Sequence, residues 1–249
     1  MPSHAVIAGL GLIGGSLGRA LRWAGWTVSF ADPHVSMKEA RAAGAADRKV
    51  DRLEGDLIVL ATPLDVAIRL LGELRHSKAL ITSTCSAMEP VRAAAKGLRF
   101  VAGHPFAGSE KSGLKAGSAG LFLRRSWFVE RDEPEVRAMI SAAGARQVVM
   151  TAKEHDRNMA FGSHLPQVLS TALASILADI DPAFIGTGAR SVLRLAASPY
   201  DTWQPVLEHN RANVRRAVDE LSRKMRELDS ADFGRANDFI RESDERRER

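Results

Sequence analysis

The sequence predicts an α/β protein made of two parts. A Rossmann-type dinucleotide-binding domain is expected over residues 1–151, followed by an all-helical dimerisation domain over residues 152–249. Two observations lead to this division. Short apolar strands alternate with helical segments as far as about residue 150, which is typical of a parallel sheet covered by helices on both faces. A glycine-rich turn directly follows the first of these strands.

The elements of the first part follow from their apolar patterns and their turn residues. Runs rich in Val, Ile, Leu and Phe predict strands over residues 4–9, 27–32, 55–63, 79–86, 99–105, 125–131 and 146–151. Residues 10–25 carry the glycines and then helical spacing, and apolar residues at helical spacing predict further helices over residues 36–44, 64–76, 88–97 and 134–144.

The second part contains no convincing strand from Lys153 to about Arg226. His155 and Asp156 open a helix, where an acidic residue can cap the end or favour the helix dipole. Residues 168–180 are apolar on nearly every side and predict a buried helix, and residues 202–229 predict one long amphipathic helix. The apolar surface of these two helices is larger than a small helical domain can bury alone, so a homodimer is expected. The last fifteen or so residues are highly charged and are expected to fray.

Composition excludes several classes of function. The chain has 249 residues and a net charge of +5, but its basic residues are interspersed with acidic ones, so no nucleic-acid partner is expected. Because no apolar run approaches the length of a membrane span, no membrane partner is expected either. The single cysteine, Cys85, rules out an internal disulfide, and no metal site is predicted. Small-residue packing is the favoured role for Cys85, and a cytoplasmic location is expected.

The glycine turn predicts a bound dinucleotide. Gly9, Gly11 and Gly14 form the pattern G-x-G-x-x-G between a strand and a helix, which places a pyrophosphate at the helix N-terminus. Asp32 ends the second strand, where a carboxylate hydrogen-bonds the ribose hydroxyls and repels a 2′-phosphate, so NAD is favoured over NADP. The remaining residues expected at this cofactor site are Leu12, Ile13, Thr62 and Pro63.

Several longer motifs carry a resemblance to a known family. They are GLGLIGGSLG, ATP, GHPFAGSEKSG, EHDRNMAFGSHLP, RLAAS and the pair Asn210-Arg211, and they span most of the chain. In these motifs the sequence resembles the prephenate and arogenate dehydrogenases of tyrosine biosynthesis. The resemblance implies NAD-dependent oxidative decarboxylation of prephenate to 4-hydroxyphenylpyruvate, or of arogenate to tyrosine.

The resemblance also assigns catalytic residues. The His of the GHP motif maps onto His104, which would accept the proton of the substrate hydroxyl as hydride departs; a neutral imidazole suits this task. The Ser of the loop after the fourth strand maps onto Ser86, which would hydrogen-bond the catalytic His. The family usually has a Lys two residues later, where this chain has Met88.

Four further residues are expected to bind the small-molecule substrate. His164 and Arg194 resemble the family's substrate-binding residues, and a guanidinium matches a carboxylate in a bidentate manner. Gln167 replaces a second His of some prephenate-using members, which leaves prephenate and arogenate both open. Glu110 is a candidate for the mouth of the pocket.

Two other classes of function stay open from the residues alone. One is a different small Rossmann reductase with a helical dimerisation domain. The other is a non-catalytic protein that senses NAD, in which His104 would be dispensable.

Overall fold

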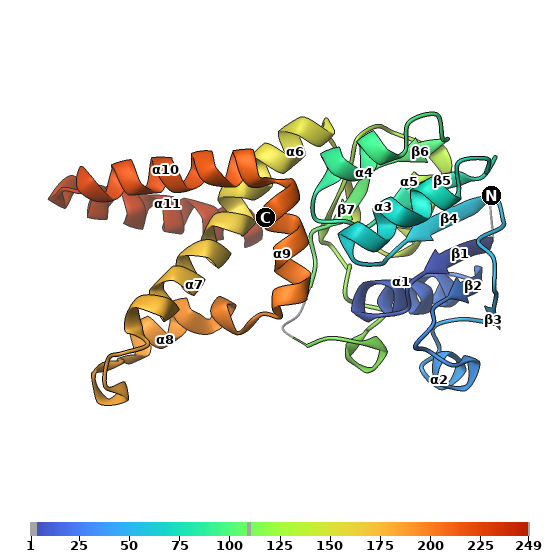
Figure 1. The fold of residues 1–249 in the computed structure, drawn as a ribbon, viewed down its shortest axis with the longest axis horizontal. Helices are drawn as coiled ribbons and strands as arrows, with labels where there is room; N and C mark the ends of the chain where they lie inside the picture. Colours follow the sequence, from blue (N-terminus) through green and yellow to red (C-terminus); the bar gives the residue numbers. More distant parts are fainter. Residues whose placement is uncertain (1–3, 109–110, 249) are drawn as a thin grey trace.

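Six parallel strands form the central sheet of the first part (Figure 1). The structure, a computed structural model, describes residues 4–108 and 111–248. The strand order in this sheet is β3-β2-β1-β4-β5-β6, which is the doubly wound arrangement that the sequence predicts. Its strands are β1 (His4–Ala8), β2 (Thr27–Ala31), β3 (Arg48–Lys49), β4 (Leu57–Leu60), β5 (Leu80–Ser83) and β6 (Phe100–Val101).

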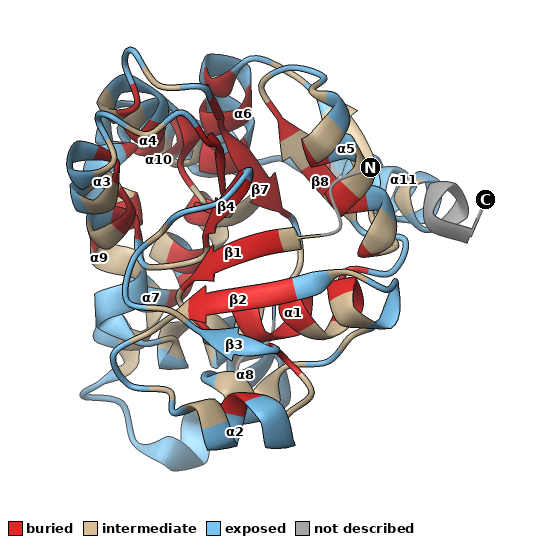
Figure 2. Ribbon diagram, turned by 90° about the vertical axis from the view of Figure 1, so that its right-hand side faces the viewer, coloured by how far each residue is buried: buried red, intermediate tan, exposed pale blue. Residues whose placement is uncertain are grey.

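Helices cover both faces of this sheet. Buried side chains form one cluster between the sheet and α1, α2 and α5, and a second cluster between the sheet and α3 and α4. As Figure 2 shows, β1 and much of β2 are buried along their length, as expected for central parallel strands. The helical elements of this part are α1 (Leu12–Trp23), α2 (Met37–Ala42), α3 (Leu64–Glu73), α4 (Met88–Ala94), η1 (Leu114–Ala116) and α5 (Pro134–Ala142).

A second, three-stranded sheet corrects the expectation of one strand over residues 99–105. The chain leaves the main sheet after β6 and starts a new strand, β7 (Gly103–Pro105), which pairs antiparallel with β8 (Ser126–Val129). The strand β9 (Arg146–Val149) pairs parallel with β8. The switch requires glycine at position 103, because a Cβ there would lie 2.9 Å from the Ser83 carbonyl oxygen.

The second part of the chain is helical, as predicted. It consists of α6 (Ala152–Met159), the π-helical turn η2 (Ala160–His164), α7 (Leu165–Leu177), η3 (Pro182–Phe184), α8 (Thr187–Leu193), η4 (Arg194–Ala197), α9 (Tyr200–His209), α10 (Arg211–Arg226) and α11 (Ser230–Glu248).

Two expectations for this part are wrong. The long amphipathic helix is broken in two at Asn210, whose backbone (φ −103°, ψ 19°) is non-helical. The charged end of the chain forms α11 instead of fraying. An ion pair between Asp232 and Lys224 connects its first turn to the end of α10, and Arg235 pairs with Asp232 within α11.

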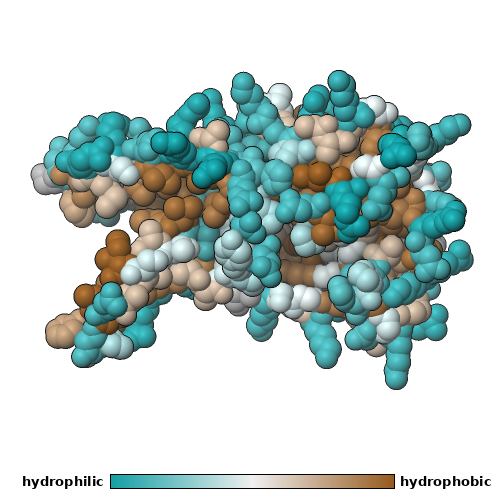
Figure 3. Space-filling view, in the orientation of Figure 1, coloured by the Kyte–Doolittle hydropathy of each residue, from teal (hydrophilic) through white to brown (hydrophobic). Residues whose placement is uncertain are grey.

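The helix α7 is not buried within one chain, contrary to the sequence prediction. Ile176 is 71% exposed and Phe184, just beyond α7, is 82% exposed. Figure 3 shows apolar surface along the two arms formed by α7–α8 and α10–α11, on the sides that face each other. An exposed apolar surface of this kind is typical of an interface, so the exposure of α7 within one chain agrees with the expected homodimer.

Replacing Ile176 with Asp is expected to weaken the dimer. A buried Ile contributes about 1.5–3 kcal/mol, and a symmetric interface loses this twice, so the dimer Kd should rise roughly 10²–10⁴-fold. Light scattering at micromolar concentration measures this change. Trp23→Asp is a matched control, because Trp23 is 85% exposed on α1, outside the helical part. A wild-type protein with the mass of one chain would contradict the prediction.

Candidate active site

The glycine turn has the backbone geometry of a dinucleotide site. Gly9 has φ +86°, and a Cβ there would lie 2.6 Å from the Ala61 carbonyl oxygen. A Cβ on Gly14 would lie 2.0 Å from the Gly9 carbonyl oxygen, so this position holds α1 against the turn. The Cβ position of Gly11 meets open space, where a phosphate can approach the N-terminus of α1.

The Asp32 carboxylate organises the same end of the sheet. Its Oδ2 accepts a hydrogen bond from the Leu10 N–H (2.7 Å), and its Oδ1 accepts from the N–H groups of His34 (2.7 Å) and Val35 (3.0 Å). The carboxylate therefore connects the glycine turn to the turn after β2. With four lone-pair sites and three donors, it retains one acceptor position for a ribose hydroxyl.

A groove of about 1080 Å³ runs along this edge of the sheet. It brings together Gly9, Gly11, Asp32, Thr62 and Pro63, which the sequence predicts as cofactor-binding residues, and continues along α3. The Thr62 hydroxyl is buried and has no hydrogen-bond partner within the described residues. A polar ligand in the groove satisfies this group, so these residues fit a dinucleotide. Leu12 and Ile13 form the first turn of α1 beside the groove.

His104 lies on β7, where the strand passes from the main sheet toward the helical part. The hydroxyl of Ser83 accepts from the Gly103 N–H (3.4 Å) and donates to the Gly103 carbonyl (3.3 Å), which fixes the start of β7 against β5. The His104 ring packs near the rings of Phe106 and Phe128, at centroid distances of 6.2 and 6.5 Å. The residue is 9% exposed, so its ring is held in a largely apolar environment.

A hydrogen-bonded chain of three side chains sets the tautomer of His104. His104 Nδ1 lies 2.9 Å from His155 Nε2, and His155 Nδ1 lies 2.7 Å from Asp156 Oδ1. A carboxylate only accepts, so His155 Nδ1 carries a proton and its Nε2 is a lone pair in the neutral ring. His104 Nδ1 must then donate, which leaves the lone pair of His104 Nε2 without a partner in the described part of the chain.

The Asp156 carboxylate also holds the N-terminus of α4. Its two oxygens accept from the N–H groups of Met88 (2.7 Å) and Glu89 (2.8 Å). The expected role of Asp156 in its own helix is wrong, because Thr151 caps α6 in a capping box with Glu154. Asp156 instead joins α4 and α6, and the Met88 side chain at this junction is buried.

Burial sets the protonation of both site histidines. It lowers the pKa of His104 well below the ordinary value, and the neighbouring His155 and His164 rings lower it further. Burial also lowers the pKa of His164 to about 4, although the Asp156 charge opposes this shift. Both rings are therefore neutral at physiological pH.

His164 ends the π-helical turn and points into the same region. It is 1% exposed, its Nδ1 lies 3.1 Å from the Asn210 amide nitrogen, and its ring makes an edge contact with Trp203. Pro166 lies two residues after His164. It has no N–H to donate to the Gly162 carbonyl four residues earlier, so regular α-helical bonding is interrupted next to the π-helical turn.

The other predicted site residues have different surroundings. No hydrogen bond joins half-buried Ser86 to His104 within residues 4–108 and 111–248. Gln167 donates to the Leu195 carbonyl (2.9 Å), and its buried Oε1 has no partner in the described structure. Arg194 lies exposed on η4, beside that carbonyl, and Glu110 lies outside the described residues. Burial raises the pKa of Cys85 to about 12, which makes this thiol unreactive.

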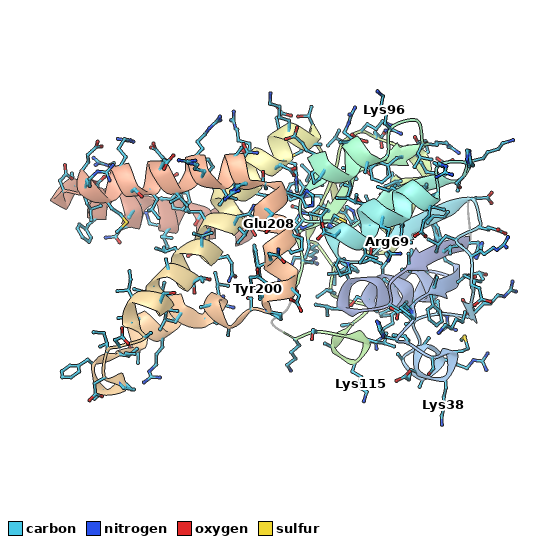
Figure 4. The ribbon with its side chains drawn as sticks, viewed as in Figure 1. Lys38, Arg69, Lys96, Lys115, Tyr200 and Glu208 are labelled. Carbon is cyan, nitrogen blue, oxygen red and sulfur yellow. The ribbon has the colours of Figure 1, made fainter. Side chains whose placement is uncertain are left out.

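The site lies where the two parts of the chain meet. Besides the Asp156 contacts, His209 at the end of α9 pairs with Asp65 at the start of α3 (2.8 Å). In Figure 4 the labels Tyr200 and Glu208 mark the two ends of α9, and Arg69 marks α3 across this boundary. Within the described residues, no group of three or more acidic, His or Cys side chains could hold a metal ion.

Three residues of the candidate site were not identified from the sequence. His155 and Asp156 stand together in the EHD motif, but their partners Met88 and His104 lie more than fifty residues away. Asn210 belongs to one of the motifs that carry the family resemblance, but the sequence assigned it no role. One signal in the sequence could have indicated the role of Asp156. It stands beside a His near the start of a helix that Thr151 already caps, so it is not needed as a cap.

The lowered histidine pKa values predict that the free energy of unfolding decreases as the pH is lowered. Below about pH 6.5 the unfolded chain protonates His104 and His164, whereas folded His164 stays neutral down to about pH 4. Each such histidine removes roughly 1.4 kcal/mol of unfolding free energy per pH unit in this window. Urea unfolding at several pH values in this range measures the slope of unfolding free energy against pH. His164→Gln should reduce this slope by roughly 1.4 kcal/mol per pH unit, the contribution of one histidine. An unchanged slope would contradict the protonation assigned to His164.

Comparison with known proteins identifies the family. The family described as "Prephenate dehydrogenase, nucleotide-binding domain" matches residues 17–139, and "Prephenate dehydrogenase, dimerization domain" matches residues 151–239. A prephenate dehydrogenase of Lactococcus lactis is 28% identical over 90% of this chain and 72% of its own length. A probable prephenate dehydrogenase of Streptomyces niveus is 30% identical over 90% of this chain and 67% of its own length.

A solved structure shows the same fold over nearly the whole chain. It is the prephenate dehydrogenase of A. aeolicus in complex with hydroxyphenyl propionate and NAD⁺, with a TM-score of 0.82 and 23% identity. The match covers 98% of this chain and 96% of that one. No helix within the described residues is long and apolar enough to cross a membrane. The chain belongs to the prephenate and arogenate dehydrogenase family, and it is a homodimeric oxidoreductase with a nucleotide-binding domain followed by a dimerisation domain.

Proposed function

We propose that His104 is the catalytic base for the oxidative decarboxylation of prephenate or arogenate. The carrying observation is the unpartnered lone pair of His104 Nε2, fixed by the chain to His155 and Asp156. In the reaction, the ring hydroxyl loses its proton to Nε2, the carbon that bears it loses a hydride, and the opposite ring carbon loses carbon dioxide. The bond electrons left by carbon dioxide complete the aromatic ring as a phenolate, which takes the proton back from His104 Nε2. When bound, NAD supplies the acceptor for the hydride.

A base of low pKa suits this proton. Because burial keeps His104 neutral, its lone pair is available at physiological pH. The hydroxyl proton becomes acidic only as hydride departs, so a weak base accepts it late in the reaction. The positive charge that then forms on His104 is stabilised through His155 by the Asp156 carboxylate, as in other His–carboxylate pairs.

His164 and Arg194 bind the anionic groups of the substrate in this proposal. A neutral His164 offers one N–H, and exposed Arg194 offers a charged, planar set of donors suited to a carboxylate. Two side chains of α7 hold the segment that carries Arg194. Gln167 donates to the Leu195 carbonyl, and the Ser170 hydroxyl accepts from the Ala196 N–H (2.8 Å).

Ser86, Glu110 and the groove residues complete the proposed site. Ser86 follows β5 three residues after Ser83, whose hydroxyl contacts Gly103 at the start of β7. Gly9, Gly11 and Asp32 would hold the pyrophosphate and the adenosine ribose. We place the boundary between the two domains after Thr151, where β9 has ended and α6 begins. A cytoplasmic location is proposed because the lone cysteine is a free, buried thiol.

The assay for this function follows NADH formation with prephenate and arogenate in turn. His104→Asn should lower kcat about 10²–10⁴-fold with little change in KM, since the base acts mainly in the transition state. Parallel measurements with NADP test the expected preference for NAD. Near-normal turnover of His104→Asn with either substrate would refute the role of His104, and no NADH formation by the wild type with either would refute the function.

Arg194→Gln should fail in a different way. A contact to a carboxylate that is charged before and during the reaction mostly affects KM, which should rise roughly 10–150-fold. Steady-state kinetics separates this effect from that of His104→Asn. The matched control is Arg190→Gln, since Arg190 is also exposed and lies one helical turn earlier, on α8. Equal effects of both variants would show that Arg194 contributes only general positive charge.

A further inference from the structure

Asn210 occupies a helix junction but does not cap either helix. It ends α9 and precedes α10, and Asn at such a position usually accepts hydrogen bonds from the first N–H groups of the following helix. Here its side chain makes no such bond. The residue is 4% exposed, and its amide points toward α6 and the π-helical turn instead. Because the Asn210 side chain does not cap α10, its buried amide has another role.

The orientation of this amide is determined by its neighbours. The Asn210 Nδ2 lies 2.8 Å from the Asp156 carbonyl oxygen, which can only accept. The opposite orientation would place two oxygens in contact. The Asn210 Oδ1 accepts from the Asn213 amide at 2.8 Å, which agrees with the same assignment.

The second N–H of this amide determines the tautomer of His164. Because Asn210 Nδ2 has donors only, His164 Nδ1 at 3.1 Å must be a lone pair. In a neutral ring the proton is then on Nε2. No partner of His164 Nε2 is found in the described part of the chain, so this N–H is free to bind a ligand.

The two site histidines therefore present opposite groups. His104 is protonated on Nδ1 and offers a lone pair at Nε2, whereas His164 has its lone pair on Nδ1 and offers an N–H at Nε2. A substrate with a hydroxyl proton to lose and carboxylates to bind needs one acceptor and one donor. With the other tautomer of His164, a lone pair would face a carboxylate.

We propose that Asn210 is a positioning residue that fixes His164 as a hydrogen-bond donor to an anionic oxygen of the substrate. The same amide holds the main chain of Asp156, whose side chain directs His155 and His104. The Asn210 side chain, at the break between α9 and α10, thus positions both His164 and the segment that carries His155 and Asp156. The kinetic consequence rests on the proposed function, but the tautomer is a property of the free protein.

Nitrogen-15 NMR of histidine-labelled protein without substrate tests the tautomer directly. The His164 resonances, assigned by their loss in His164→Ala, should show a proton on Nε2 and none on Nδ1. Asn210→Asp replaces the donor with an acceptor, so Nδ1 should gain a proton. Asn158→Asp, an exposed change on α6, is the matched control and should leave the His164 signals unchanged. A wild-type His164 protonated on Nδ1, or an unchanged Nδ1 in Asn210→Asp, would overturn the proposal.

Kinetics then tests whether Asn210 acts through His164. Asn210→Ala should raise KM on the order of 10-fold, the loss of one hydrogen bond to a charged group, with a smaller change in kcat. Combined with His164→Ala, it should cause little further change, because the two residues act as one unit. Additive effects would overturn the proposal. Wild type inactive with both substrates but with the expected His164 tautomer would refute the function and support the tautomer assignment.

Discussion

One buried carboxylate, that of Asp156, holds the site together. It accepts two N–H groups from the start of α4 and one from the His155 ring, so all its donors come from groups that are fixed by other elements. A buried carboxylate without donors would be costly, whereas this one is satisfied by three short hydrogen bonds. The same contacts dock the helical part on the nucleotide-binding part and direct the lone pair of His104. In the proposed mechanism, docking and catalysis therefore depend on the same interaction.

Neutral histidines shape the electrostatics of the site. Burial keeps His104 and His164 uncharged, so neither contributes positive charge toward an anionic substrate. In the proposed complex that charge comes from Arg194 at the exposed edge, and the histidines supply directional hydrogen bonds. This division lets the base stay unprotonated in a site that binds carboxylates. A protonated His104 would bind the same substrate but could not accept its proton.

The sequence predicted the features that depend on local geometry. The glycine turn could be recognised because Gly9 and Gly14 are needed within one strand-turn-helix unit. His104 was found through its motif. The contacts of Asp156 with α4 were not predictable, because they join segments 67 and 68 residues apart. The break at Asn210 was also missed, since apolar periodicity shows which residues avoid water but not where a helix is interrupted.

The π-helical turn explains how two histidines from one continuous helical segment reach the same site. His155 and His164 are nine positions apart, and at 3.6 residues per turn this spacing places them about half a turn apart, on opposite faces. The wider turn of η2 rotates the helix less per residue and brings His164 back toward the face of His155. Asn210 can then reach both the Asp156 carbonyl and His164 Nδ1. Gly162, which tolerates irregular backbone, and Pro166, which cannot continue α-helical bonding, favour the departure from regular geometry at this point.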